Sequence, residues 1–312
     1  MLTRRHIRVK VMQSLYAMTQ SQSDHLDKEL KFLNYSMEQM YDLLLIMLQL
    51  LVAIRDLAED QLHKSRHKHL ATQEDKNPNT KFIQNEVLQL LASNEVLQER
   101  IRKRKLNVWE LDSEYVALIW KSIRDDESYA DYMKVSEKTF AADRSFIVQI
   151  FKEIIAPDDK LYEYIEDKRL TWIDDLPLVN TALVKMIKKL KPNATAFLPA
   201  LYKDEEDKDF ALRLFRKAFA SSETYTAAID GKTPNWDKDR IAELDKIMIS
   251  MAICEFLEFP SIPVKVTINE YLEIAKEYST PKSSIFINGI LDKISKEYYA
   301  SDKIQKIGRG LL

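Results

Sequence analysis

Three arginines near the start of the chain have the type and spacing that phosphate binding requires. Arg4, Arg5 and Arg8 fall within about 100 degrees of one face of a predicted helix, and no Asp or Glu comes before Asp24. A guanidinium stays charged and donates two parallel hydrogen bonds, which suits phosphate oxygens. Tyr16 follows about three turns along the same side, where its ring could stack on a base. The residues alone favour a solvated helix face, with an RNA-binding edge as the alternative.

A second basic group closes another predicted helix. Cations in a last turn complement the helix dipole, so a solvated helix end is the favoured interpretation, and an extension of an RNA path is the alternative. The group consists of Arg100, Arg102, Lys103, Arg104 and Lys105.

Three histidines invite a test for metal binding. His63 and His67 are one helical turn apart, a spacing that zinc ligands use, and His69 follows. No cysteine or carboxylate completes the set, and a cation would be repelled by the basic neighbours Lys64, Arg66 and Lys68. We therefore predict no metal site.

Signatures of catalysis are missing from the sequence. The only glycines are Gly231, Gly289, Gly308 and Gly310, which leaves no glycine-rich loop to hold a phosphate or a nucleotide cofactor. No Ser or Cys nucleophile motif is present, and the paired acids stand at predicted helix ends, where capping explains them. Cys254, the single cysteine, has apolar neighbours and is expected to be a core thiol. We predict neither an enzyme nor a cofactor.

The apolar periodicity predicts an all-α protein with no confident strand. Thr3 is the expected N-cap of the first helix, and Thr280 and Pro281 are expected to open the last one. A polar stretch over 65–80 is the best loop candidate of the first half. The predicted helices before the last one cover 3–22, 28–63, 82–106, 112–132, 208–229, 237–259 and 265–278.

Three of these elements carry further expectations. The helix over 237–259 is apolar on most faces, which predicts a central position. Gly289 lies inside the last helix at a cost of about 1 kcal/mol relative to alanine, so we expect a close helix contact there. The tail from 301 to 312 is expected to fray.

Charge and hydropathy restrict the remaining classes. The net charge is −2 in a chain of 312 residues, so any nucleic-acid signal must be local. The basic start is not followed by an apolar run of signal-peptide type, and the apolar stretch 43–54 is too short to cross a bilayer. We expect a cytoplasmic protein without membrane contact.

Four motifs give the chain a family resemblance. They begin with Arg-Arg-His-Ile-Arg at Arg4, followed by Gln-Ser-Leu-Tyr at Gln13. The others are Trp-Asp-Lys-Asp-Arg-Ile at Trp236, Ile-Pro-Val-Lys-Val-Thr-Ile-Asn-Glu at Ile262 and Phe-Ile-Asn-Gly-Ile-Leu-Asp-Lys at Phe286. In this order and spacing they resemble the NusB family of transcription antitermination factors. The resemblance covers about 4–22 and 208–297.

The resemblance implies an all-α bundle of two small helical subdomains, here enlarged by inserted helices. It implies RNA binding without catalysis, at the boxA element of ribosomal RNA leaders. The implied partners are the ribosomal protein NusE and the RNA polymerase elongation complex, and the family also allows a homodimer. Carried over by position, the implied RNA-binding residues are Arg4, Arg5, Arg8, Tyr16, Lys282 and Ser283, and the implied partner-binding residues are Tyr16 and Phe286.

The chain departs from the family in its length. We predict a NusB-like first helix in 1–29, an inserted helical region in 30–207, a NusB-like C-terminal half in 208–299 and a tail in 300–312. Trp172 and Trp236 match at a spacing of 64 residues, which leaves open a duplicated helix pair at about 143–190. The insertion also leaves an alternative function open, a protein–protein adaptor with little RNA affinity. Inserted helices that bury Arg4, Arg5 and Arg8, or that pair each of them with an acid, would favour that alternative.

Overall fold

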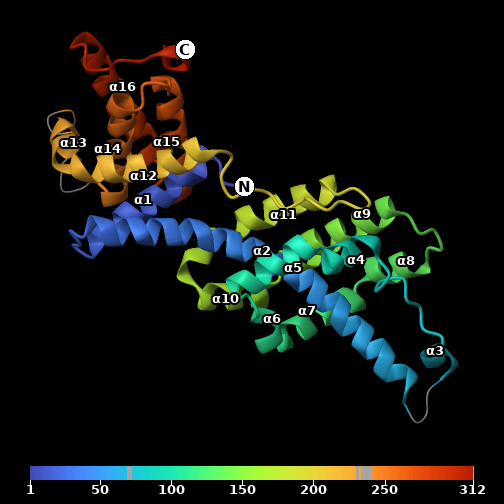
Figure 1. Ribbon diagram of the computed structural model, residues 1–312. Helices are drawn as coiled ribbons and strands as arrows, with labels where there is room; N and C mark the ends of the chain where they lie inside the picture. Colours follow the sequence, from blue (N-terminus) through green and yellow to red (C-terminus); the bar gives the residue numbers. More distant parts are fainter. Residues whose placement is uncertain (69–71, 230–231, 233–240, 312) are drawn as a thin grey trace. The chain divides into compact units, whose positions relative to one another are not determined.

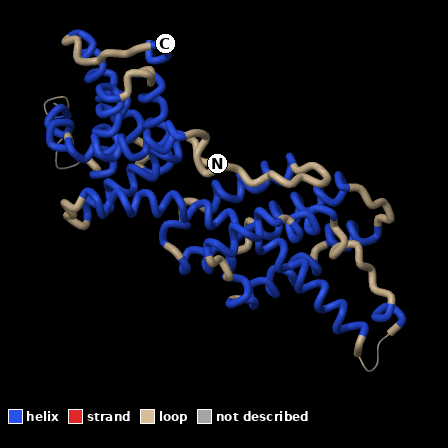
Figure 2. Tube along the Cα trace, viewed as in Figure 1, coloured by secondary structure: helices blue, strands red, loops and turns tan. Residues whose placement is uncertain are grey.

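The computed structural model describes residues 1–68, 72–229, 232 and 241–311, and over these ranges the chain is helical with no strand (Figure 1, Figure 2). This confirms the predicted all-α class. The chain divides into two compact units. The terminal unit comprises Met1–Met37 and Leu201–Leu312, and the central unit comprises Glu38–Ala200.

The terminal unit is built around one buried helix. This helix, α14 (Glu243–Glu258), packs against all the other helices that lie wholly in the unit, and Figure 1 draws it between α13 and α15. Its residues from Ile247 to Phe256 are buried, as expected of a helix that is apolar on most faces. The central position predicted for it is confirmed. Its neighbours are α1 (Arg4–Gln20), α12 (Glu205–Ala220), α13 (Ser222–Ile229), α15 (Val264–Tyr278) and α16 (Ser283–Ala300).

The first helix follows its sequence pattern closely. Thr3 is the N-cap of α1: its hydroxyl accepts from the His6 backbone N–H, and the His6 ring returns a contact to the Thr3 backbone N–H. The four apolar positions spaced by three and four residues are all buried, namely Ile7, Val11, Leu15 and Met18. They fix which face of α1 turns toward α14 and α12.

One long helix contributes to both units. α2 (Leu26–Arg66) gives its first residues to the terminal unit and its residues from Glu38 onward to the central unit. The apolar stretch 43–54 belongs to the central unit and is buried except at Gln49 and Ala53, which are partly exposed, and this confirms a buried helix there. Among the described residues, no helix is long and apolar enough to cross a membrane.

The central unit packs short helices against α2. The indole N–H groups of Trp109 and Trp172 each donate a 2.8 Å hydrogen bond to an α2 carbonyl, those of Ile46 and Gln39. The remaining elements are α3 (Gln73–Lys76), α4 (Glu86–Ser93), α5 (Glu95–Arg104), α6 (Val108–Leu111), α7 (Ser113–Asp125), α8 (Glu127–Lys134), α9 (Phe140–Ile150), the π-helical turn Phe151–Ile155, α10 (Asp159–Lys168), the 3₁₀ turn Leu170–Trp172 and α11 (Leu176–Lys189).

Three helices expected to be continuous are each broken into two. The predicted helix over 82–106 divides at Asn94, whose side chain accepts from the Leu97 backbone N–H and starts α5. The one over 112–132 divides at Asp126, which caps α8, and the one over 208–229 divides at Ser221. In the first two cases a side-chain oxygen satisfies free N–H groups of a new first turn, which favours a restart over continuation.

Several finer expectations were wrong. A Cβ added at Gly289 would meet nothing within 4 Å, so no close helix contact explains this glycine. The last helix begins at Ser283, and Thr280 and Pro281 lie in the preceding turn, where the Ser283 N–H donates to the Thr280 carbonyl. The tail ends in a 3₁₀ turn (Gly308–Leu311) and buries Ile304 and Lys306. The polar stretch over 65–80 contains the short helix α3. Asp230, Gly231, Trp236 and Asp239 lie outside the described residues.

Candidate nucleic-acid interface

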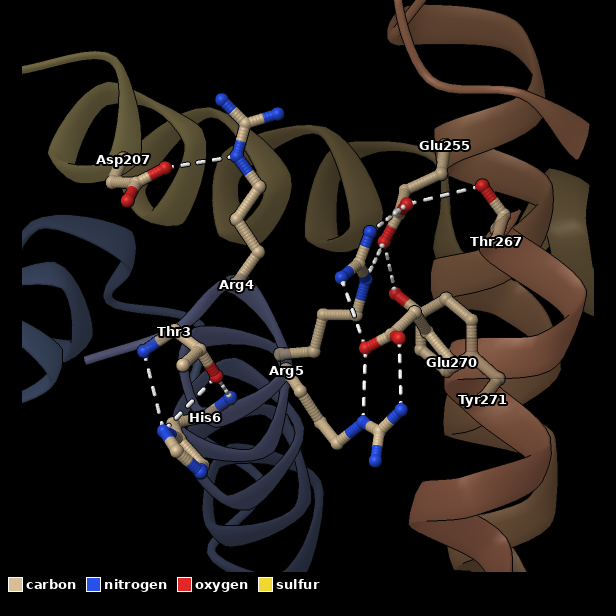
Figure 3. A network of polar contacts seen from close by, with 10 residues as sticks. Thr3, Arg4, Arg5, His6, Asp207, Glu255, Thr267, Glu270 and Tyr271 are labelled. Atoms are coloured by element: carbon tan, nitrogen blue, oxygen red, sulfur yellow. Dashed lines mark hydrogen bonds and ion pairs between the residues drawn. The ribbon is translucent and has the colours of Figure 1, made fainter. Parts of the chain in front are cut away.

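The three arginines of α1 do not share one environment, and Arg8 is the most enclosed. Its guanidinium donates two 2.7 Å hydrogen bonds to the Glu255 carboxylate of α14, and both side chains are buried. Tyr271 and Thr267 of α15 donate to the same carboxylate at 2.7 Å and 3.2 Å. Figure 3 shows these two side chains converging on Glu255. The arrangement is a buried charge pair with its lone pairs satisfied, so the Arg8 guanidinium is not presented to solvent.

Electrostatics keep the Arg8 guanidinium ionised. Burial alone would lower the pKa of Arg8, but the charge and hydrogen bonds of Glu255 outweigh it, and the pKa lies above its ordinary value. Burial, and then the Glu255 charge, raise the pKa of Tyr271 well above its ordinary value. Tyr271 is therefore a neutral donor to a charged acceptor, the kind of hydrogen bond that is strongest in a buried site.

Arg5 and Arg4 lie at the edge of the same cluster. Arg5 donates from Nε and Nη2 to the Glu270 carboxylate at 3.0 Å and 2.9 Å, and Arg4 donates from Nε to Asp207 Oδ1 at 2.8 Å (Figure 3). Each of these two arginine side chains is 37% exposed, against 2% for Arg8. The hydrogen bond from Arg5 lowers the pKa of Glu270, so this acid is ionised at neutral pH.

The exposed sides of these arginines open into a groove of about 700 Å³. Its walls come from the first turn of α1, from the turn between α14 and α15, from α15 and from the C-terminal segment. The lining residues are Thr3, Arg4, Arg5, His6, Arg8, Ser261, Ile262, Pro263, Val266, Glu270 and Arg309. Four of the eleven are arginines and one is an acid. Asp207 and Glu255, which do not line the groove, pair with Arg4 and Arg8, so a smaller positive excess remains to attract an anionic ligand.

The other residues implied by the resemblance lie apart from this groove. Tyr16 is exposed near the far end of α1, about 16 Å along the helix from Arg5 at 1.5 Å per residue. Lys282 is exposed before α16, and Ser283 is buried with hydrogen bonds to Ser279 and Thr280. Phe286 is partly exposed. The groove therefore brings together Arg4, Arg5 and Arg8 and does not include Tyr16, Lys282, Ser283 or Phe286.

The second basic group is mostly engaged within the central unit. Arg104 forms 2.6 Å contacts with both Asp42 and Glu38, Lys103 pairs with Glu99, and Arg100 donates to the Tyr41 hydroxyl. Residues 102–105 are exposed, which agrees with the favoured interpretation of a solvated helix end, and the ion pairs are an addition that the sequence did not predict.

The histidines and the cysteine occupy ordinary structural positions. The His63 and His67 rings lie 4.5 Å apart, and His69 is outside the described residues. Within the described ranges no three metal-binding side chains come together. Cys254 is fully buried in α14, as expected, and burial raises its pKa to about 12, so its thiol is not an activated nucleophile.

Sequence reasoning missed the acids that hold the arginines. Glu255 carried a usable signal, because a carboxylate inside the apolar run of α14 requires a buried partner. Asp207 and Glu270 carried none, since each looks like an ordinary acid of an exposed helix face. Arg309 was missed because its segment was expected to fray.

Comparisons with known proteins place the chain among named relatives. The NusB family model matches residues 181–296, a range that does not include α1. The transcription antitermination protein NusB of Salinibacter ruber (strain DSM 13855 / M31) is 39% identical over 112 residues, which is 36% of this chain and 70% of that protein. Its namesake from Koribacter versatilis (strain Ellin345) is 40% identical over 100 residues, 32% of this chain and 68% of that protein.

A third relative and a solved structure complete the comparison. The NusB protein of Chloroherpeton thalassium (strain ATCC 35110 / GB-78) is 39% identical over 109 residues, 35% of this chain and 52% of that protein. The solved structure of T. maritima NusB is 27% identical and covers 46% of this chain and 89% of its own. The TM-score of that match is 0.30, too low to assign elements of one structure to the other.

Proposed function

Because the chain belongs to the NusB family, we propose that it is an RNA-binding transcription antitermination factor. In this proposal it binds a boxA-type element of nascent ribosomal RNA together with NusE, within the RNA polymerase elongation complex. It acts in the cytoplasm by binding alone and performs no catalytic step. The relatives carry the antitermination role in their names, and the RNA, NusE and polymerase are our extension to this chain.

The observation that carries the proposal is the arginine-lined groove at the first turn of α1. Pairing with acids does not exhaust these arginines, because a guanidinium has five N–H donors. Arg5 uses Nε and Nη2 on Glu270, which leaves Nη1. Arg4 uses Nε on Asp207, and its Nη2 lies 3.6 Å from Glu206, which leaves Nη1. The acids hold the guanidinium groups of Arg4 and Arg5 in place, while their remaining N–H donors stay available to phosphate oxygens.

Arg8 takes a different part in this proposal. Its side chain is 2% exposed, its Nε and Nη2 donate to Glu255, and its Nη1 lies 3.6 Å from Glu270, so Arg8 supports the floor of the groove instead of touching RNA. We therefore assign it a positioning role. Phosphate contact is assigned to Arg4 and Arg5.

The implied residues outside the groove are proposed as the continuation of the surface. Tyr16 offers an exposed ring for stacking, and Lys282 offers an exposed amine about one turn before Phe286. The Ser283 hydroxyl is engaged by Ser279 and Thr280, so its proposed role is to shape the turn beneath Lys282. NusE is proposed to contact Tyr16 and Phe286.

One observation favours the adaptor alternative. All three arginines of α1 are paired with acids, which partly cancels the positive charge that would attract RNA. A protein–protein adaptor with the NusB fold would show little retention on heparin at low salt. A protein with an open basic groove would be retained on heparin under the same conditions.

The deciding experiment is a titration of the full chain with boxA-like RNA and a scrambled control at two salt concentrations, with and without NusE. The test variant combines Arg4→Ala and Arg5→Ala. The matched control is Arg216→Ala, an exposed α12 residue of the terminal unit that lies outside the groove.

We expect selective binding that NusE strengthens. Each lost phosphate contact should flatten the log–log salt dependence by roughly 0.7. Arg216→Ala should leave affinity unchanged. Absence of selective binding by the unaltered chain, with and without NusE, would reject the proposal in favour of the adaptor.

A further inference from the structure

The C-terminal segment is anchored to the end of α14, next to the arginine groove. Lys306 donates 3.0 Å hydrogen bonds to the backbone carbonyls of Glu255 and Phe259, and the Ile307 N–H donates to the Pro260 carbonyl at 3.1 Å. Ile304 is buried beside this contact. A lysine ammonium at the last carbonyls of a helix complements the negative end of the helix dipole. The segment is thus fixed by backbone contacts to the same helix that carries Glu255.

Two glycines shape the turn that follows. Gly308 has φ +53°, a conformation that glycine adopts without strain. A Cβ at Gly310 would come within 1.9 Å of the Pro260 carbonyl oxygen, so only glycine fits at this approach. Between them stands Arg309, whose position is set by the constraints on both neighbours.

Arg309 differs from the other arginines of the groove in its charge environment. It lines the groove with Arg4 and Arg5, and its side chain is exposed. Among the described residues it has no acid or hydrogen-bond partner, whereas Arg4, Arg5 and Arg8 are each held by a carboxylate. A phosphate that binds Arg309 therefore meets an uncompensated charge and displaces no existing ion pair.

We propose that the C-terminal segment forms a wall of the RNA groove and that Arg309 is its leading phosphate-binding side chain. This inference rests on the proposed function and specifies which side chain of the groove contributes most to RNA affinity. Arg4 and Arg5 then act as secondary contacts, because part of their charge is already neutralised by Asp207 and Glu270. The Lys306 and Gly310 contacts are positioning features that hold Arg309 at the groove.

The test is an equilibrium titration of the full chain with boxA-like RNA at two salt concentrations. It compares Arg309→Ala with Arg4→Ala, Arg5→Ala and the control Arg216→Ala. We expect Arg309→Ala to weaken binding about tenfold, the scale of one hydrogen-bonded charge contact, and to flatten the salt slope by roughly 0.7. The loss should exceed that of either single α1 variant.

A second variant separates position from charge. Gly310→Ala keeps Arg309 but forces the segment away from Pro260, so it should reproduce part of the loss, with an unchanged circular dichroism spectrum showing that the fold is kept. An unchanged affinity in Arg309→Ala, while Arg4→Ala and Arg5→Ala weaken binding, would overturn the inference and leave the proposed function standing. An equal loss in Arg216→Ala would also overturn it, because bulk charge would then explain the effect. Failure of the unaltered chain to bind RNA would overturn both.

Discussion

At the scale of single residues, the three arginines of α1 owe their different environments to acids on three other helices, α12, α15 and α14. Arg4, Arg5 and Arg8 share one helix face, which suggested one shared environment. Their acidic partners lie 203, 265 and 247 positions away. No local sequence pattern predicts a contact across such separations, because the contact depends on how α12, α14 and α15 pack against α1. Only Glu255, a charge within an apolar run, showed that a buried partner had to exist.

The buried pair leads to a prediction about stability. Glu255→Ala removes both close hydrogen bonds of the buried Arg8 charge and leaves it only the 3.6 Å contact with Glu270, so we expect a loss of about 3–5 kcal/mol in the free energy of unfolding. Urea unfolding followed by circular dichroism measures it. The control is Glu258→Ala on the same helix, where a partly exposed pair with Lys217 should be worth no more than about 1 kcal/mol. Equal losses in both variants would show that Glu255 has no special part in the core.

Lys306 predicts a dependence of stability on alkaline pH. Burial lowers its pKa from 10.5 to about 8 in the folded chain, while the unfolded chain keeps the ordinary value. Between these values the unfolded state binds more protons, so stability rises as pH increases from 8 to 10.5. We expect the unaltered chain to gain up to about 3 kcal/mol of unfolding free energy relative to Lys306→Met as the pH rises across this window, because methionine does not titrate. Urea unfolding at several pH values measures it, and a flat difference would contradict the lowered pKa.

At the scale of elements, hydrophobic periodicity located the helices and local capping decided where they stopped. The pattern was sufficient for α1 and α15, each of which forms one unbroken helix. It failed over 82–106 and 112–132, where Asn94 and Asp126 start new helices inside a continuous apolar stripe. Each of these residues precedes a glutamate, which supplies the acidic first turn of a new helix. Asn269 also precedes a glutamate and yet lies inside the unbroken helix α15, so a cap-type residue followed by an acid does not by itself predict a break.

The ion pair between Arg5 of α1 and Glu270 of α15 leads to a prediction about the RNA affinity of the groove. Glu270→Gln removes the one acid that lines the groove and frees Arg5 from a charged partner. We expect RNA affinity to rise about fivefold at low salt, the scale of one close charge pair in water, with a steeper salt slope. The sign is opposite to that of Arg5→Ala. Glu273→Gln, one turn further on α15 and outside the groove, is the control in the same titration. Unchanged or weaker binding by Glu270→Gln would count against the groove as the RNA path.

At the scale of the whole molecule, the sequence predicted one insertion and the contacts define two units. The predicted insertion began at residue 30, inside α2, because the sequence offers no break along that helix. The contacts place the division at Met37 and Glu38, within the same helix, and again near residue 200. A boundary inside a continuous helix has no proline, glycine or loop to mark it. It is defined only by which core each turn of α2 joins.

Each unit has its own core, and this predicts how the chain unfolds. We expect two transitions in differential scanning calorimetry, since cooperative unfolding follows compact units with separate cores. Glu255→Gln, in the terminal unit, should lower the midpoint of one transition alone. Phe146→Ala should lower the other by removing about 3–5 kcal/mol, because its buried ring stacks 3.8 Å from that of Tyr132 in the central unit. If both variants lower a single shared transition, α2 couples the two cores into one cooperative structure. The helix that crosses the boundary would then transmit stability between the units, and the groove would depend on residues far outside its own unit.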